Sequence, residues 1–182
     1  IYQPRAVVTH FEGVSHGTDT GVGIKAYQVW NKRRFADKWQ QVLSQHRSNG
    51  VEPMLERDRP ARARILWIEA CMLTPDQDSG SLRTIRLLRI LVRMGCKVTY
   101  VADNLDGKEQ YRLQLSREGI EVIHAPFFSS VRDYLRQHGA EFDIVTLCRH
   151  YIAIQHIQTV RDVNPAAKIW FDTIDLHYLR LR

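Results

Sequence analysis

Short apolar runs alternate with stretches of helical spacing through the last two thirds of the chain. Strands are predicted at residues 65–70, 97–102, 120–124, 143–148 and 168–172, and helices at residues 81–94, 108–118, 129–138 and 150–163. Runs that are apolar throughout are typical of strands buried on both faces of a parallel sheet. Gly95, Gly119 and Gly139 follow helix ends, where a left-handed cap is expected. The pattern predicts an α/β fold with a doubly wound parallel sheet.

The first third of the chain has a different pattern. It predicts a strand at residues 2–10, a Gly/Ser/Thr-rich loop at 12–23 and a long helix at 24–45, whereas residues 46–64 carry prolines and charges without apolar periodicity. One strand and one helix cannot bury the large aromatic side chains of this helix. We interpret residues 1–46 as the tail of a truncated domain, 47–63 as a linker and 64–182 as a Rossmann-like domain. The start at Ile1, without a signal pattern, is typical of a fragment.

Charge and cysteine usage narrow the class of protein. The net charge is +6, and residues 1–64 carry 11 Lys/Arg against 6 Asp/Glu, while residues 65–182 carry 15 against 14. The basic excess suits phosphate-bearing partners or a solvated helix face, and we predict no nucleic-acid binding. No apolar run approaches the ~20 residues of a membrane span, which leaves peripheral membrane association open. Cys71, Cys96 and Cys148 lack C-x-x-C spacing and are expected to be reduced core residues of a cytoplasmic protein.

The turn at residues 74–81, TPDQDSGS, is the first candidate site. It lies after the first strand of the sheet, at the edge where open parallel sheets bind ligands. Ser79 or Ser81 is expected to cap the helix, and Gly80 would allow the backbone N–H groups to approach an anion. Asp76 and Asp78 would repel a phosphate, so they are expected either to bind sugar hydroxyls or to act as cap and turn residues. The turn contains neither G-x-G-x-x-G nor a P-loop pattern.

The ends of the fourth and fifth strands supply further polar candidates at the same edge. Arg149 suits recognition of a carboxylate or phosphate, or forms a polar helix start together with His150. After the fifth strand, Asp172, Asp175 and His177 follow in FDTIDLH. His177, with a carboxylate two residues away, is expected to act as a base or phosphate donor, or to be a solvated loop residue.

Possible metal ligands cluster near the amino-terminal end of the chain. His10, Glu12, His16 and Asp19 lie within ten residues, and imidazole and carboxylate groups bind Mn²⁺ and similar ions. His46, His124, His138 and His156 are scattered without ligand spacing, and no function is predicted for them.

Several of these motifs resemble glycosyltransferases. Residues 65–182, with PDQDSGSLR at 75–83, VADNL at 101–105 and FDTIDLHYLR at 171–180, resemble the amino-terminal half of a GT-B glycosyltransferase of the family 4 type. Residues 1 to about 60, with VVTHFEGVSHGTD at 7–19 and KAYQVWNKRRFADKW at 25–39, resemble the carboxyl-terminal end of a family 2, GT-A fold enzyme.

The resemblance implies a function, partners and site residues. It implies a fragment of a bacterial protein that transfers sugars from a nucleotide-sugar donor to a glycan or lipid-linked acceptor of surface polysaccharide or O-antigen. His10 would match a metal ligand of the intact GT-A domain, which uses Mn²⁺ or Mg²⁺, and the GT-B half would need no cofactor. Asp78, Ser79 and Gly80 would face the cleft, and His177 would be the catalytic residue. The fragment alone is expected to be inactive.

A non-catalytic doubly wound binding module, of the receiver type, is the alternative. The acid that ends the first predicted strand, in ILWIE, is compatible with it. However, the strands at 120–124 and 143–148 end in His124 and in Leu147-Cys148-Arg149, with no phosphorylatable Asp.

Overall fold

The computed structural model describes residues 7–9, 11, 14 and 17–174. The chain divides into two compact units, Ile1–Glu56 and Arg57–Arg182, and each is described by itself.

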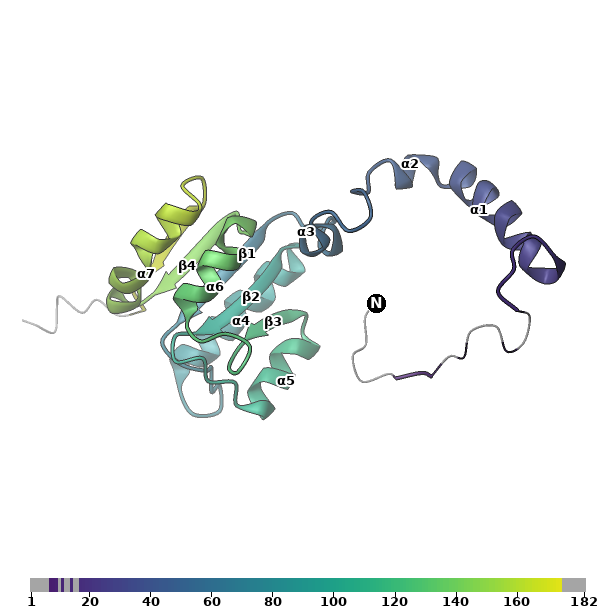
Figure 1. Cartoon of the computed structure of the whole chain (residues 1–182). Coiled ribbons are helices and arrows are strands. Elements are labelled where there is room, and N and C mark those ends of the chain that lie inside the picture. The colour runs from purple at the N-terminus through teal and green to yellow at the C-terminus, as the bar shows by residue number, and fades with distance from the viewer. Residues whose placement is uncertain (1–6, 10, 12–13, 15–16, 175–182) are drawn as a thin grey trace, which may run out of the picture. The chain divides into compact units, whose positions relative to one another are not determined.

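The second unit contains a five-stranded, all-parallel sheet with the strand order β3-β2-β1-β4-β5 (Figure 1). The strands are β1 (Arg64–Glu69), β2 (Lys97–Ala102), β3 (Ile120–Ile123), β4 (Ile144–Cys148) and β5 (Lys168–Asp172), and the helices are α4 (Ser79–Arg93), α5 (Glu109–Arg117), α6 (Val131–His138), η2 (Gly139–Glu141) and α7 (His150–Val163). These bounds differ from the predicted ones by at most two residues. The prediction of an α/β doubly wound parallel sheet is confirmed.

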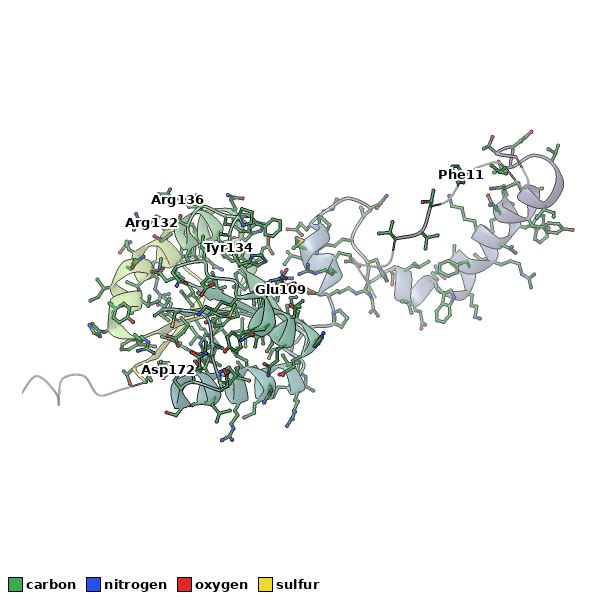
Figure 2. The ribbon with its side chains drawn as sticks, turned by 90° about the horizontal axis from the view of Figure 1, so that it is seen from below. Phe11, Glu109, Arg132, Tyr134, Arg136 and Asp172 are labelled. Carbon is green, nitrogen blue, oxygen red and sulfur yellow. The ribbon has the colours of Figure 1, made fainter. Side chains whose placement is uncertain are left out.

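Two hydrophobic clusters hold the helices against the sheet. On one face, alternate strand residues such as Leu66 and Val145 pack with side chains of α6 and α7. On the other face, Trp67 and Tyr100 pack with α4 and α5. The α6 helix has one buried and one exposed side as a result. Tyr134 is buried, whereas Arg132 and Arg136 are exposed on the outer side (Figure 2). Burial of both faces explains why the strands are apolar throughout.

Two of the three predicted glycine caps are confirmed, and the third is wrong. Gly95 and Gly119 both have a φ of 82°, the left-handed conformation that ends α4 and α5. Gly139 instead has a φ of −58° and begins η2. A glycine is needed here for a different reason, because a Cβ atom at this position would lie 2.7 Å from Cγ2 of Val163 on α7. Close packing, and not backbone conformation, requires this glycine.

The regular elements that the structure describes in the first unit are helices. It contains η1 (Gly23–Lys25), α1 (Ala26–Lys38) and α2 (Gln40–Leu43), and α3 (Pro53–Arg57) follows within the segment predicted as a linker. The predicted helix at 24–45 is therefore interrupted at Trp39, whose φ of −109° and ψ of 17° leave the helical region. Of the strand predicted at residues 2–10, only residues 7–9 are described, and they are not in a strand. No residue of α1 is buried.

Candidate functional site

The strand order places a switch point between β1 and β4. From β1 the chain runs outward through β2 to β3, and it then returns to the other side of β1 to form β4 and β5. In open α/β sheets, ligands bind beyond the carboxyl ends of the strands at such a point. Glu69 ends β1, Arg149 follows β4 and Asp172 ends β5. These polar residues and the turn before α4 define the candidate site.

An ion pair between Glu69 and Arg149 lies at the switch point. Nε of Arg149 donates to Oε1 of Glu69 over 2.9 Å, and the backbone N–H of Ala70 donates to the same carboxylate oxygen over 3.0 Å. Glu69 is 3% exposed, so its charge depends on these partners. Burial alone would lower the pKa of Arg149, but the hydrogen bond to Glu69, the negative charge of Glu69 and smaller contributions from Tyr151 and Cys71 together raise the pKa. Sequence reasoning selected Arg149 and missed its partner, which the acid at the strand end could have indicated.

The backbone of Arg149 is strained. Its φ of 74° and ψ of 146° lie close to a region that is essentially restricted to glycine, and its N–H donates to the carbonyl of Asp172 over 2.8 Å. The strain is a consequence of connecting β4 directly to α7 through a single residue. The pair with Glu69 uses only Nε, so among the residues that the structure describes the terminal guanidinium nitrogens can donate to a ligand at the sheet edge.

The N-terminus of α4 is capped by Asp78. The prediction that Ser79 or Ser81 would be the cap is wrong. Oδ1 of Asp78 accepts from the N–H of Ser81 over 2.7 Å, and its Oδ2 accepts from the hydroxyls of Ser81 over 2.6 Å and Thr74 over 3.0 Å. Burial would raise the pKa of Asp78, but the hydrogen bonds from Ser81 and Thr74 hold it below its usual value. The Asp78 carboxylate thus occupies the place that an anion would take at the start of α4, beside Gly80. The geometry of Asp78 supports its predicted role as a helix cap.

Asp76 is engaged by the neighbouring helix α5. The hydroxyl of Tyr111 lies 2.8 Å from Oδ1 and 3.1 Å from Oδ2 of Asp76, and the side-chain amide of Gln77 donates to the same hydroxyl over 3.0 Å. These contacts fix the turn before α4 against α5. The exposed Asp76 carboxylate keeps lone pairs that can accept from a ligand hydroxyl.

Two further polar pairs at this edge were not predicted. Arg83 of α4 donates to Oδ2 of Asp172 over 2.6 Å, and this bond raises the pKa of Arg83 (Figure 2 labels Asp172). Beyond β2, Nε2 of His156 lies 2.6 Å from Oδ1 of Asp103, and His156 is only 2% exposed. Both pairs join residues more than 50 positions apart, so no local pattern reveals them.

The cysteines differ from expectation in one case. Cys148 is buried in the sheet and Cys96 is half-buried, but Cys71, just after β1, is exposed. Its thiol nevertheless has a raised pKa, because partial burial and the nearby charge of Glu69 both oppose the thiolate. Cys71 is therefore an edge residue at the candidate site and not a core residue.

Three predicted site residues, His10, Asp175 and His177, lie outside the described residues, as do Glu12 and His16. Among the residues that the structure does describe, no group of three or more His, Cys, Asp or Glu side chains is placed to hold a metal ion. Within the same residues, no helix is long and apolar enough to cross a membrane.

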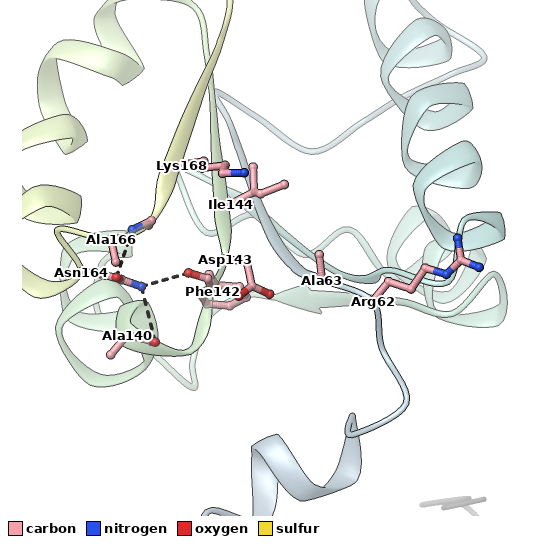
Figure 3. A pocket seen from close by; sticks show the side chains of 10 residues that line it. Arg62, Ala63, Ala140, Phe142, Asp143, Ile144, Asn164, Ala166 and Lys168 are labelled. Atoms are coloured by element: carbon pink, nitrogen blue, oxygen red, sulfur yellow. Dashed lines mark hydrogen bonds between the residues drawn. The ribbon is translucent and has the colours of Figure 1, made fainter.

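A pocket of about 540 Å³ lies at the opposite, amino-terminal edge of the sheet (Figure 3). Asn164 lies in its wall and is held by the carbonyls of Gly139 and Phe142, at 3.3 and 2.9 Å from its amide nitrogen. Its lining also includes Asp143 and Lys168. Because ligands of such sheets bind at the other edge, and because Asn164 is fully used in loop contacts, we assign this pocket no role in the candidate site.

The chain was compared with protein-family models, with curated proteins and with solved structures, and none of them matches it. The candidate site is therefore defined by the topology of the sheet and by its own side chains.

Proposed function

We propose that the second unit is the acceptor-binding half of a GT-B-type glycosyltransferase, which transfers a sugar from a nucleotide-sugar donor to a glycan or lipid-linked acceptor. The observation that carries this proposal is the switch point between β1 and β4, where charged side chains from three strand ends and one turn converge. The resemblance of the motifs at residues 75–83 and 171–180 to such enzymes points to the same edge.

The side chains at this edge suit a polyhydroxylated ligand. Carboxylates accept hydrogen bonds from sugar hydroxyls, and the terminal nitrogens of Arg149 can donate to a hydroxyl oxygen. Asp78 already neutralises the start of α4, so a hydroxyl-bearing ligand suits this edge better than a free phosphate. In transfer, these residues would hold and orient the acceptor hydroxyl toward the donor, which contributes through proximity. The donor-binding half, cytoplasmic location, peripheral membrane association and polysaccharide assembly belong to this proposal as well.

Binding of saccharides to the ¹⁵N-labelled 182-residue protein tests the proposal. N-acetylglucosamine, galactose and short oligosaccharides should shift the backbone amide signals of residues 70–74, 76–78 and 149 in a saturable way, and Arg149→Gln should weaken this binding. Arg132→Gln is the matched control, because Arg132 is exposed on α6. We expect no transfer from UDP-glucose by this protein alone. If no saccharide shifts these amides, the acceptor-side assignment is wrong.

A non-catalytic receiver-type module is less well supported. Receiver domains have the strand order 2-1-3-4-5, whereas this sheet has β3-β2-β1-β4-β5. In addition, Glu69, the acid at the end of β1, is already engaged in an ion pair with Arg149. Incubation with acetyl phosphate should therefore leave the protein unphosphorylated, and a stable phosphoaspartate would favour the receiver-type module instead.

A further inference from the structure

A second concave feature lies on the lateral face of the sheet that carries α4. This groove, of about 360 Å³, is bounded by aliphatic side chains of α4 and by the aromatic side chain of Trp170 on β5, above β1 and β4. On α4 it extends from Arg83 to Leu91, a helical span of roughly 12 Å at ~1.5 Å per residue. Its volume falls within the range of small-molecule sites.

The walls of the groove are apolar. Leu87, Ile90 and Leu91 form the α4 side, and the side chain of Trp170 forms the β5 side, whereas Phe171 is in register with Leu147 and its side chain lies on the other face of the sheet. Trp170 is 43% exposed, so aromatic surface is left without cover among the described residues. An aromatic ring stacked on such surface gains roughly 1–3 kcal/mol per ring.

The floor of the groove contains one buried polar atom without a partner and one with a weak partner. Oγ1 of Thr146, a residue that is 1% exposed, makes no hydrogen bond with any described residue. The indole N–H of Trp67, a residue that is 3% exposed, interacts with the thiol of Cys148, which is only a weak acceptor. Buried polar groups are normally satisfied, so this floor favours a ligand that presents hydrogen-bonding atoms on its edge.

The two charged residues at the end of the groove neutralise each other. Arg83 and Asp172 pair over 2.6 Å at the mouth, so the groove offers no unpaired charge there. A sugar ring is also disfavoured, because most of its hydroxyls would face Leu87, Ile90 and Leu91 and would lose water without gaining a partner. An uncharged heteroaromatic ring has apolar faces for the walls and acceptors on its edge for the floor.

We propose that this groove binds an uncharged heteroaromatic ring of the nucleobase class, with one ring face on Trp170 and its edge toward Trp67 and Thr146. The two floor atoms are buried, so binding requires the side chains that cover them to move. The proposal is independent of the transferase role, because it concerns another face of the sheet and other residues than Glu69 and Arg149.

The indole N–H signals of the ¹⁵N-labelled protein provide the test. Adenosine and uridine are the probes and glucose is the comparison; the signal of Trp67 should move with a nucleoside, while those of Trp30 and Trp39, in the first unit, should not. Thr146→Val should weaken binding about threefold to tenfold and Trp170→Ala at least fivefold. Ile154→Ala, on the exposed side of α7, should have no effect.

Three results would overturn the proposal: an unmoved Trp67 signal at millimolar nucleoside, an equal response to glucose, or unchanged affinity in the Thr146→Val protein. The Val side chain has nearly the same shape as Thr, so this variant tests the hydrogen bond even if Trp170→Ala disturbs the edge strand. A failure here leaves the saccharide-induced shifts at residues 70–74 and 76–78 untouched, and the reverse also holds.

Discussion

Replacing Arg149 tests whether the candidate site combines a buried ion pair with backbone strain. Arg149→Ala leaves the Glu69 carboxylate, which is 3% exposed, with the Ala70 N–H and the weakly donating thiol of Cys148 as its partners. Breaking a fully buried pair costs about 3–5 kcal/mol, but about a third of the Arg149 side chain is exposed, which screens the loss. We expect a destabilisation of about 2 kcal/mol at neutral pH.

Arg149→Gly separates the strain from the ion pair. Glycine adopts a φ of 74° and ψ of 146° freely, which releases about 1–3 kcal/mol, while its freedom in the unfolded chain costs about 0.5–1 kcal/mol. The Gly variant should therefore be more stable than the Ala variant by about 1 kcal/mol, although both lack the ion pair. Equilibrium urea unfolding, followed by far-UV circular dichroism, should show a difference in midpoint of about 0.5 M.

The double variant Glu69→Gln/Arg149→Ala is the control for the ion pair. A neutral amide in place of the buried carboxylate should recover most of the stability that Arg149→Ala loses, because no unpaired charge remains. If Arg149→Gly is less stable than Arg149→Ala, the backbone of this residue is not strained. If the double variant is no more stable than Arg149→Ala, Glu69 does not depend on its partner.

Three further predictions concern single positions. Asp78→Ala should lower the free energy of unfolding, measured in urea, by about 1 kcal/mol, and Asp78→Asn should lower it much less. Because the pKa of Asp78 is lowered in the folded protein, the destabilisation by Asp78→Ala should be full at neutral pH and should shrink as the pH falls below about 3.9. Gly139→Ala should cost about 1–3 kcal/mol through its contact with Val163, and adding Val163→Ala should relieve part of that cost, whereas equal stability of both proteins would exclude the contact. Iodoacetamide, followed by peptide mass spectrometry, should modify Cys71 in the folded protein only slowly below the pH at which an ordinary thiol ionises, because its pKa is raised, and should modify Cys148 only after unfolding.

Much of the second unit could be predicted from the sequence because its signals are local. A strand such as β2 is apolar along its whole length, and a helix such as α7 repeats apolar residues every three or four positions, so both were predicted at the bounds that the structure shows. The same regularity places Arg149 and Asp172 at one edge. The helix at 24–45 was predicted as continuous because periodicity does not record the conformation of Trp39, where it breaks.

The remaining features depend on contacts that no local pattern contains. Asp78 and not Ser79 caps α4, because its carboxylate accepts hydrogen bonds from both the Thr74 hydroxyl and the Ser81 N–H. These two bonds form only when the turn folds back on itself. The prediction of a left-handed cap at Gly139 is wrong, because this position requires a glycine only where α7 packs closely against it. The pairing of Arg83 with Asp172, 89 positions later, requires the finished sheet.

The position of β1 in the middle of the sheet has a consequence for folding. It is the first strand to be synthesised, yet its second neighbour, β4, begins only at Ile144, and the bond from the Arg64 N–H to Asp143 spans 79 positions. Until β4 arrives, one edge of the apolar β1 stays unpaired. Such late, non-local pairing slows folding and exposes strand edges to intermolecular pairing. Nascent chains that end before residue 144 should therefore depend on chaperones, and lowering the temperature during expression should raise the soluble yield of this protein.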